Sequence, residues 1–70
     1  MGPSERFAAN LRKTRKEAGL SQETLARAAN LHRTEISLLE RAEREPRLST
    51  IVRLANGLGV PAAVLLDDLP

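Results

Sequence analysis

Two short helical patterns, separated by a residue that favours a turn, constrain the fold of this chain more than any other feature of its sequence. Ser21 is a good helix N-cap, and Leu25 and Ala29 then recur on one helical face. Asn30 follows, and asparagine tolerates the left-handed backbone that a sharp reversal of the chain needs. Apolar spacing resumes beyond it, so residues 21–41 predict two short helices joined by a tight turn.

The second of these helices presents two unlike faces. Projected at about 100° per residue, Ile36 and Leu39 point one way together with Glu40. The residues of the opposite stripe, of which only the last is charged, are Thr34, Ser37, Leu38 and Arg41. A solvated helix face more often carries Glu/Lys pairs, so this stripe is either shaped to approach another surface closely or is an ordinary exposed face. Both interpretations stay open at this point.

Chain length limits the fold to one small domain. A chain of 70 residues buries only about 60% of its unfolded surface, so its stability requires well-packed helices or the pairing of two chains. The sequence has no cysteine, and His32 is its only histidine. We therefore expect no disulfide, no metal site and no cofactor.

Charge and aromatic content narrow the classes of partner. The formal net charge is +2, with both signs interleaved along the chain, so a nucleic-acid role depends on where the charges lie. Phe7 is the only aromatic residue, which disfavours stacking on single strands and leaves double-stranded DNA open. The longest apolar run, residues 62–66, is too short to span a bilayer, and the N-terminus lacks a signal peptide. We expect a cytoplasmic protein, nucleoid-associated when bound to DNA, with no membrane partner.

A helix from Ser4 to about Ala18 is predicted before the central pair. Ser4 is a suitable N-cap, and Gly19 ends the helix. The residues of its apolar face are Phe7, Leu11, Thr14 and Ala18. Arg15 borders this face, whereas Arg12 lies on the basic side of the helix, where it either contacts phosphate or is simply solvated.

Two more helices are predicted after a charged connector that Pro46 keeps from being continuously helical. Ser49 can cap the first of them, and Gly59 closes it. The residues of its apolar stripe are Ile51, Leu54, Ala55 and Leu58. A last short helix runs over residues 61–67. The predicted fold is therefore all-α, a single five-helix domain over residues 1–70.

Short motifs at ordered spacings along the chain resemble one known family. They are Leu-Ser-Gln-Glu at 20–23, Leu-Ala at 25–26, Ile-Ser at 36–37, Leu-Glu-Arg at 39–41, Leu-Ala at 54–55 and Leu-Gly-Val-Pro at 58–61. Together they resemble the Cro/phage-repressor (XRE) family of helix-turn-helix DNA-binding domains over residues 6–66. Within that family the chain is also similar to the controller proteins of restriction-modification systems. The resemblance implies a compact repressor-like fold whose helices 2 and 3 form the helix-turn-helix.

The resemblance implies that the second helix of the motif lies in the DNA major groove with its N-terminal residues at the base edges. The residues at base-facing positions are His32, Arg33, Thr34, Ser37 and Leu38. Arg33 is the strongest candidate for specificity, because a guanidinium can donate two hydrogen bonds to guanine O6 and N7. The residues expected to contact phosphates are Ser21, Gln22, Arg12, Arg41, Arg44 and Arg47. The expected partner is double-stranded DNA, with no small-molecule substrate.

Three further positions acquire a structural interpretation from the resemblance. The family commonly pairs the residues at Arg15 and Glu40, so we predict an ion pair that ties helix 1 to helix 3 and fixes their geometry. The family usually has glycine where Ala42 stands. Either Ala42 adopts a left-handed conformation or helix 3 continues for a further turn.

The last helix carries more apolar surface than one small domain can cover. Val64, with Ala62 and Leu48, is predicted to form a self-complementary patch, so we expect a homodimer to which residues 60–69 contribute. In a twofold dimer, the second helix of the motif from each copy is the recognition helix. The two recognition helices would lie about 34 Å apart, on successive major-groove turns of a pseudo-palindromic operator. The expected activity is transcription regulation, with repression by blocking polymerase as the default.

Two other functions compete with this prediction. A helical protein-interaction module, such as an antitoxin-like or adaptor partner, uses the same fold without reading DNA, and Glu35 and the acidic connector then matter more than Arg33 and Gln22. An enzyme has little support, because the sequence shows no nucleophile-base constellation, phosphate loop or metal site. We therefore expect no catalytic activity.

Overall fold

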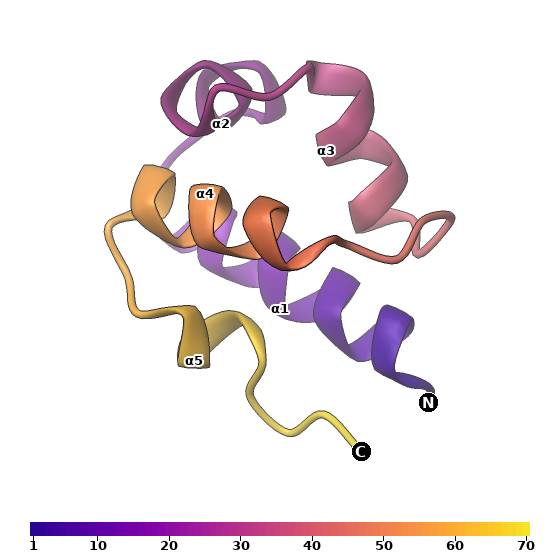
Figure 1. Cartoon of the computed structure of the whole chain (residues 1–70). Helices are drawn as coiled ribbons and strands as arrows, with labels where there is room; N and C mark the ends of the chain where they lie inside the picture. Colours follow the sequence, from indigo (N-terminus) through magenta and orange to yellow (C-terminus); the bar gives the residue numbers. More distant parts are fainter.

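Five helices and no strand follow one another along the chain in the computed structural model, which describes residues 1–70 (Figure 1). The helices are α1 (Pro3–Glu17), α2 (Gln22–Ala29), α3 (Arg33–Glu40), α4 (Leu48–Leu58) and α5 (Ala62–Leu65). The predicted all-α fold, with a helix-turn-helix built from the second and third helices, is confirmed.

The hydrophobic core lies where all five helices meet. Helix α2 packs against α3 and α4, α1 packs against α3 and α5, and α4 also packs against α5. The largest fully buried side chains are Phe7, Leu11, Leu25, Ile36, Leu39, Leu54 and Leu65. Figure 1 shows α2 and α3 at one end of the molecule and α5 with both chain ends at the other. The helix-turn-helix is therefore presented on a surface remote from the C-terminal segment.

The turn between α2 and α3 forms as the sequence predicts. The Ser21 hydroxyl oxygen accepts a hydrogen bond from the backbone N–H of Thr24 at 3.0 Å, which caps α2. Asn30 adopts a left-handed conformation with φ 56°, and the N–H of Leu31 then donates to the carbonyl of Ala26 at 2.8 Å. These bonds satisfy both ends of the short helix α2 and fix the direction in which α3 departs.

Two predicted helix starts were wrong. Ser4 lies inside α1, whose N-cap is Gly2, because Pro3 has a φ already suited to the first helical position. Ser49 lies inside α4, whose N-cap is Arg47. Pro46 keeps the preceding residue extended, and the helix starts two residues beyond it without a side-chain cap.

Two predicted helix ends also need correction. Ala18 is exposed and is the C-cap of α1, so it does not extend the apolar face of that helix. Helix α5 ends at Leu65, two residues before the predicted end at Asp67. Asp68 has a left-handed backbone with φ 60°, which is incompatible with further helix.

Ala42 takes the left-handed alternative, with φ 58°. Its N–H donates to the carbonyl of Leu39 at 3.1 Å, and the N–H of Glu43 donates to the carbonyl of Leu38 at 2.9 Å. These are the two hydrogen bonds of a Schellman motif, which normally has glycine at the left-handed position. Alanine costs about 1 kcal/mol there, and in return α3 ends sharply and the connector turns towards α4.

Gly57 lies where α4 packs closely against the end of α2. A Cβ atom at this position would lie 3.1 Å from the backbone N of Ala29 and 3.2 Å from the carbonyl carbon of Ala28. Judged from the sequence alone, this glycine lowers the helix propensity of α4. The structure shows instead that the absence of a side chain lets the two helices pack backbone to backbone.

We expect Gly57→Ala to lower the melting temperature, although alanine has the higher helix propensity by about 1 kcal/mol. Backbone atoms of α2 must move to make room for the new methyl group, and such overpacking typically costs about 1–3 kcal/mol. The matched control is Asn56→Ala at the neighbouring exposed position, which should leave the melting temperature unchanged or raise it. Thermal unfolding followed by circular dichroism measures both, and stabilisation by Gly57→Ala would contradict the close approach.

Candidate nucleic-acid interface

The N-terminal half of α3 carries the most accessible of the side chains expected to face bases. His32, Arg33 and Thr34 are exposed, whereas Ser37 and Leu38 are half-buried. His32 is the N-cap residue of α3, and its imidazole makes no capping hydrogen bond. The opposite face of the helix is anchored in the core by two side chains with no exposed surface, Ile36 and Leu39. Helix α3 is thus rigidly held on one side and open to another molecule on the other.

An ion pair between α1 and α3 fixes the orientation of α3. Arg15 Nε donates to Glu40 Oε2 at 2.6 Å, and Arg15 Nη2 donates to Glu40 Oε1 at 2.9 Å. The two side chains are only 11% and 3% exposed. The hydrogen bond that Arg15 donates to Glu40 raises the pKa of Arg15 above its ordinary value, so the guanidinium stays charged. A third hydrogen bond, which Arg15 Nη1 donates to the carbonyl of Leu20 at 2.9 Å, attaches the segment before α2 to the same pair.

Gln22 joins this network from the start of α2. Its Nε2 donates to Glu40 Oε1 at 3.2 Å, a contact that the sequence did not indicate. One carboxylate therefore binds side chains from both α1 and α2, and it fixes α2 and α3 relative to each other. An amide nitrogen has two N–H donors, and only one of those of Gln22 is used in this contact.

The remaining residues expected to contact phosphates lie in different environments. Arg41 Nε lies 3.6 Å from Glu43 Oε2, and Arg44 is paired with Glu35. Arg12 is exposed on α1 and Arg47 is exposed at the start of α4. The Ser21 hydroxyl is engaged in capping α2 and in a 2.8 Å hydrogen bond with Thr24 Oγ1.

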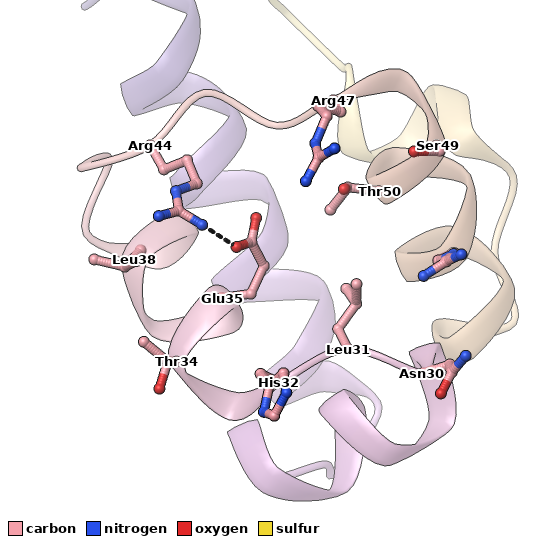
Figure 2. Close-up of a pocket in the computed structure, with 11 residues that line it drawn as sticks. Asn30, Leu31, His32, Thr34, Glu35, Leu38, Arg44, Arg47, Ser49 and Thr50 are labelled. Atoms are coloured by element: carbon pink, nitrogen blue, oxygen red, sulfur yellow. Dashed lines mark hydrogen bonds and ion pairs between the residues drawn. The ribbon is translucent and has the colours of Figure 1, made fainter.

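A groove lies between α3, the connector of residues 41–47 and the first turns of α4 (Figure 2). Its volume is about 720 Å³. The residues that line it are Asn30, Leu31, His32, Thr34, Glu35, Leu38, Arg44, Arg47, Ser49, Thr50 and Arg53. We call it the α3–α4 groove. It brings together three arginines and one carboxylate, so its net charge is positive. Arg44 and Arg47 project into it from the connector, whereas Glu35 enters from α3.

Arg53 is the one charged member of the groove that the sequence did not single out. It lies four residues after Ser49 on α4, and this spacing places both side chains on one helical face. The spacing was visible in the sequence. What the sequence lacked was the direction of that face, which depends on how α4 packs against α2.

The predicted dimer patch is partly covered by the chain itself. Leu48 is 77% exposed and Val64 is 40% exposed, but Ala62 is half-buried and packs against the core. Two large apolar side chains that the sequence did not single out, Val52 and Leu66, are also exposed. Apolar surface is therefore available on α4 and near the C-terminus, with Ala62 contributing little of it.

The structure contains no group of three or more His, Cys, Asp or Glu side chains placed to hold a metal ion. None of its helices combines the length and the apolar character required to cross a bilayer.

Comparison with known proteins identifies relatives over nearly the whole chain. The family described as helix-turn-helix matches residues 11–65. The chain is 44% identical over 66 residues to control protein C.SmaI of Serratia marcescens, a match that covers 94% of this chain and 79% of that protein. It is 32% identical over 62 residues to the cryptic phage CTXphi transcriptional repressor RstR of Vibrio cholerae. That match covers 89% of this chain and 56% of the repressor.

Solved structures agree with these sequence matches. The restriction-modification controller protein C.AhdI of Aeromonas hydrophila superposes with a TM-score of 0.86 at 37% identity, over 89% of this chain and 94% of that one. The resemblance to restriction-modification controllers is confirmed. The chain belongs to the XRE-type helix-turn-helix family of transcription regulators.

Proposed function

We propose that this chain binds a specific sequence of double-stranded DNA as a homodimer and represses transcription from it. The observation that carries the proposal is the exposed N-terminal half of α3, held in place by the buried pair of Arg15 and Glu40. A recognition helix must reach base edges without moving against its own domain. Exposure of Arg33 and Thr34 together with rigid anchoring of α3 meets both requirements.

Base readout in this proposal is centred on Arg33. Its guanidinium can donate a pair of hydrogen bonds to guanine in the major groove, and Thr34 and Ser37 can bond to bases or phosphates. Leu38 can contact a thymine methyl group with the part of its side chain that is exposed. His32 is the exposed N-cap of α3. It therefore lies at the end of α3 that would enter the DNA major groove first.

Phosphate contacts would come from two sides of α3. On one side, Gln22 has a spare donor, and the N-terminus of α2 that Ser21 caps favours negative charge. On the other side, Arg44 and Arg47 line the α3–α4 groove, and α4 begins without a side-chain cap, so its first N–H groups are available to an anion. Arg41 and Arg12 would contribute at the edges of this surface.

Dimerisation supplies the affinity that one small domain lacks. Val64 and Leu66 near the C-terminus, and Leu48 and Val52 on α4, are exposed apolar side chains that a second copy can cover. Two copies related by a twofold axis would read an inverted repeat whose half-sites lie one helical turn apart. The names of the relatives, control proteins and a phage repressor, are consistent with regulation of this kind.

Selection of bound sequences from random duplex DNA tests the proposal. We expect an inverted repeat with a guanine in each half-site. We expect Arg33→Ala to weaken binding to it by about 10- to 100-fold for each half-site, because each half-site loses one bidentate contact to guanine. The control is Arg27→Ala, which removes the same charge from an exposed position in the last turn of α2. Competitor DNA in the assay separates this specific loss from general electrostatic attraction.

A protein-interaction module would give a different result. If the selection enriches no sequence, specific DNA binding is refuted. If duplex binding is indifferent to both Gln22→Ala and Arg33→Ala, the adaptor function is favoured instead.

A further inference from the structure

Glu35 is the only acidic residue that lines the α3–α4 groove, which otherwise carries the guanidinium groups of Arg44, Arg47 and Arg53. It belongs to α3 but does not lie on the stripe that includes Thr34 and Ser37. Its carboxylate turns towards the connector instead (Figure 2). A single negative charge thus lies within the surface on which the proposed function requires phosphates to bind.

The carboxylate of Glu35 accepts a hydrogen bond from Nη1 of Arg44. The Glu35 side chain is only 18% exposed, whereas that of Arg44 is 51% exposed. Solvent therefore screens the carboxylate weakly, and its negative charge acts on any anion that approaches the groove. The exposed part of Arg44 is the part that an incoming phosphate would meet.

We propose that Glu35 is an internal competitor of the DNA phosphate for Arg44. A carboxylate and a phosphodiester offer the same acceptor geometry to a guanidinium, namely two oxygens that match its fork of donors. In the free protein Glu35 occupies Arg44 and cancels its charge. When a phosphate binds, either Arg44 leaves Glu35 or two negative charges share one guanidinium, and both arrangements have a free-energy cost. This inference rests on the proposed function, because it concerns the same DNA surface.

The competition sets how strongly the chain binds any duplex. With Glu35 present, one of the three arginines of the groove contributes little net attraction, and fewer counterions are released when DNA binds. The basal affinity for random DNA stays low, so base contacts such as that of Arg33 account for a larger share of the binding free energy. A weak background is useful to a regulator that must find one site among many.

Glu35→Gln is the decisive substitution. It keeps the size of the side chain and removes the competing charge, so we expect duplex affinity to rise by roughly three- to tenfold. The slope of log K against log salt concentration should steepen by up to about 0.9 for each bound protomer, the value for one additional phosphate contact. Fluorescence anisotropy with a labelled duplex at several salt concentrations measures both quantities.

The matched control is Glu45→Gln, which makes the same chemical change on the exposed connector, where Glu45 forms no ion pair. Both variants raise the net charge by one, so an equal gain in the two would show a general charge effect and overturn the inference. Arg44→Ala should weaken binding more in the Glu35→Gln background than in the unsubstituted chain. Equal losses in the two backgrounds would also overturn it.

Weaker binding by Glu35→Gln would show that Glu35 positions Arg44 for DNA, which is the opposite role. Thermal unfolding of each variant separates a change in folding from a change in binding, because competition predicts the affinity gain at temperatures where both proteins are folded. A different result would refute the proposed function itself, namely that the unsubstituted chain binds no duplex DNA. If it binds duplex DNA and the Glu35→Gln variant shows no gain, only the competition is refuted.

Discussion

Replacing Glu40 by alanine is expected to lower the free energy of unfolding by about 3–5 kcal/mol, the typical cost of removing one partner of a buried ion pair. The Arg15 side chain is 11% exposed and would lose both of its hydrogen bonds to the carboxylate. It cannot escape by losing its proton, because an arginine guanidinium is not deprotonated in proteins. Gln22 would lose its bond to the same carboxylate.

Chemical denaturation monitored by circular dichroism measures this loss against two controls. Glu43→Ala breaks the exposed pair with Arg41, whose closest atoms are 3.6 Å apart, and should cost less than about 1 kcal/mol. Replacing both members of the buried pair by apolar residues, Arg15→Met with Glu40→Leu, should recover most of the lost stability, because no charge is then left unpaired. A loss in Glu40→Ala no larger than that in Glu43→Ala would show that the pair is not desolvated.

The same pair explains why stability and binding are connected in this molecule. Arg15 and Glu40 lie outside the surface proposed to meet DNA, yet they hold α3 against α1 and bring Gln22 beside the end of α3. Loss of the pair would therefore misplace the base-facing side chains even in molecules that remain folded. A change of about 1 Å in such a supporting contact is enough to weaken a site that depends on geometry.

Local features of this chain were predictable because their causes are local. The capping of α2 by Ser21, the left-handed Asn30 and the closure of α4 by Gly59 each depend on a few neighbouring residues. The apolar periodicity also identified Ile36 and Leu39 as the buried face of α3. The pair of Arg15 and Glu40 was predicted through family resemblance, since no local rule connects residues 25 positions apart.

The two wrong helix starts had a local cause: Ser4 and Ser49 are plausible caps in isolation, but Pro3 and Pro46 lie shortly before them and each helix starts earlier. Features that depend on how helices pack were also missed. The role of Gly57 requires knowing that α2 lies against that turn of α4. The ion pair of Glu35 with Arg44 and the place of Arg53 in the groove likewise arise from the path of the connector, which Ala42 redirects.

Val64→Lys is expected to have the largest effect on DNA binding if the second copy covers the C-terminal surface. Val64 is 40% exposed, and a lysine at a twofold interface would bring two like charges together and desolvate both. The variant should be monomeric at concentrations where the unsubstituted chain is a dimer. Its affinity for an inverted repeat should fall by about 10²- to 10⁴-fold, because the second half-site is no longer bound intramolecularly.

The sign of the introduced charge makes this result specific. An added lysine strengthens general attraction to DNA, so a loss of affinity can be attributed to the loss of the dimer. Ala9→Lys, on the exposed face of α1, adds the same charge and should keep both the dimer and the affinity. Affinity for a single half-site should be unchanged or slightly higher in Val64→Lys. Sedimentation velocity and fluorescence anisotropy measure assembly and binding, and a variant that remains dimeric would place the interface elsewhere, with Leu48 and Val52 on α4 as the next candidates.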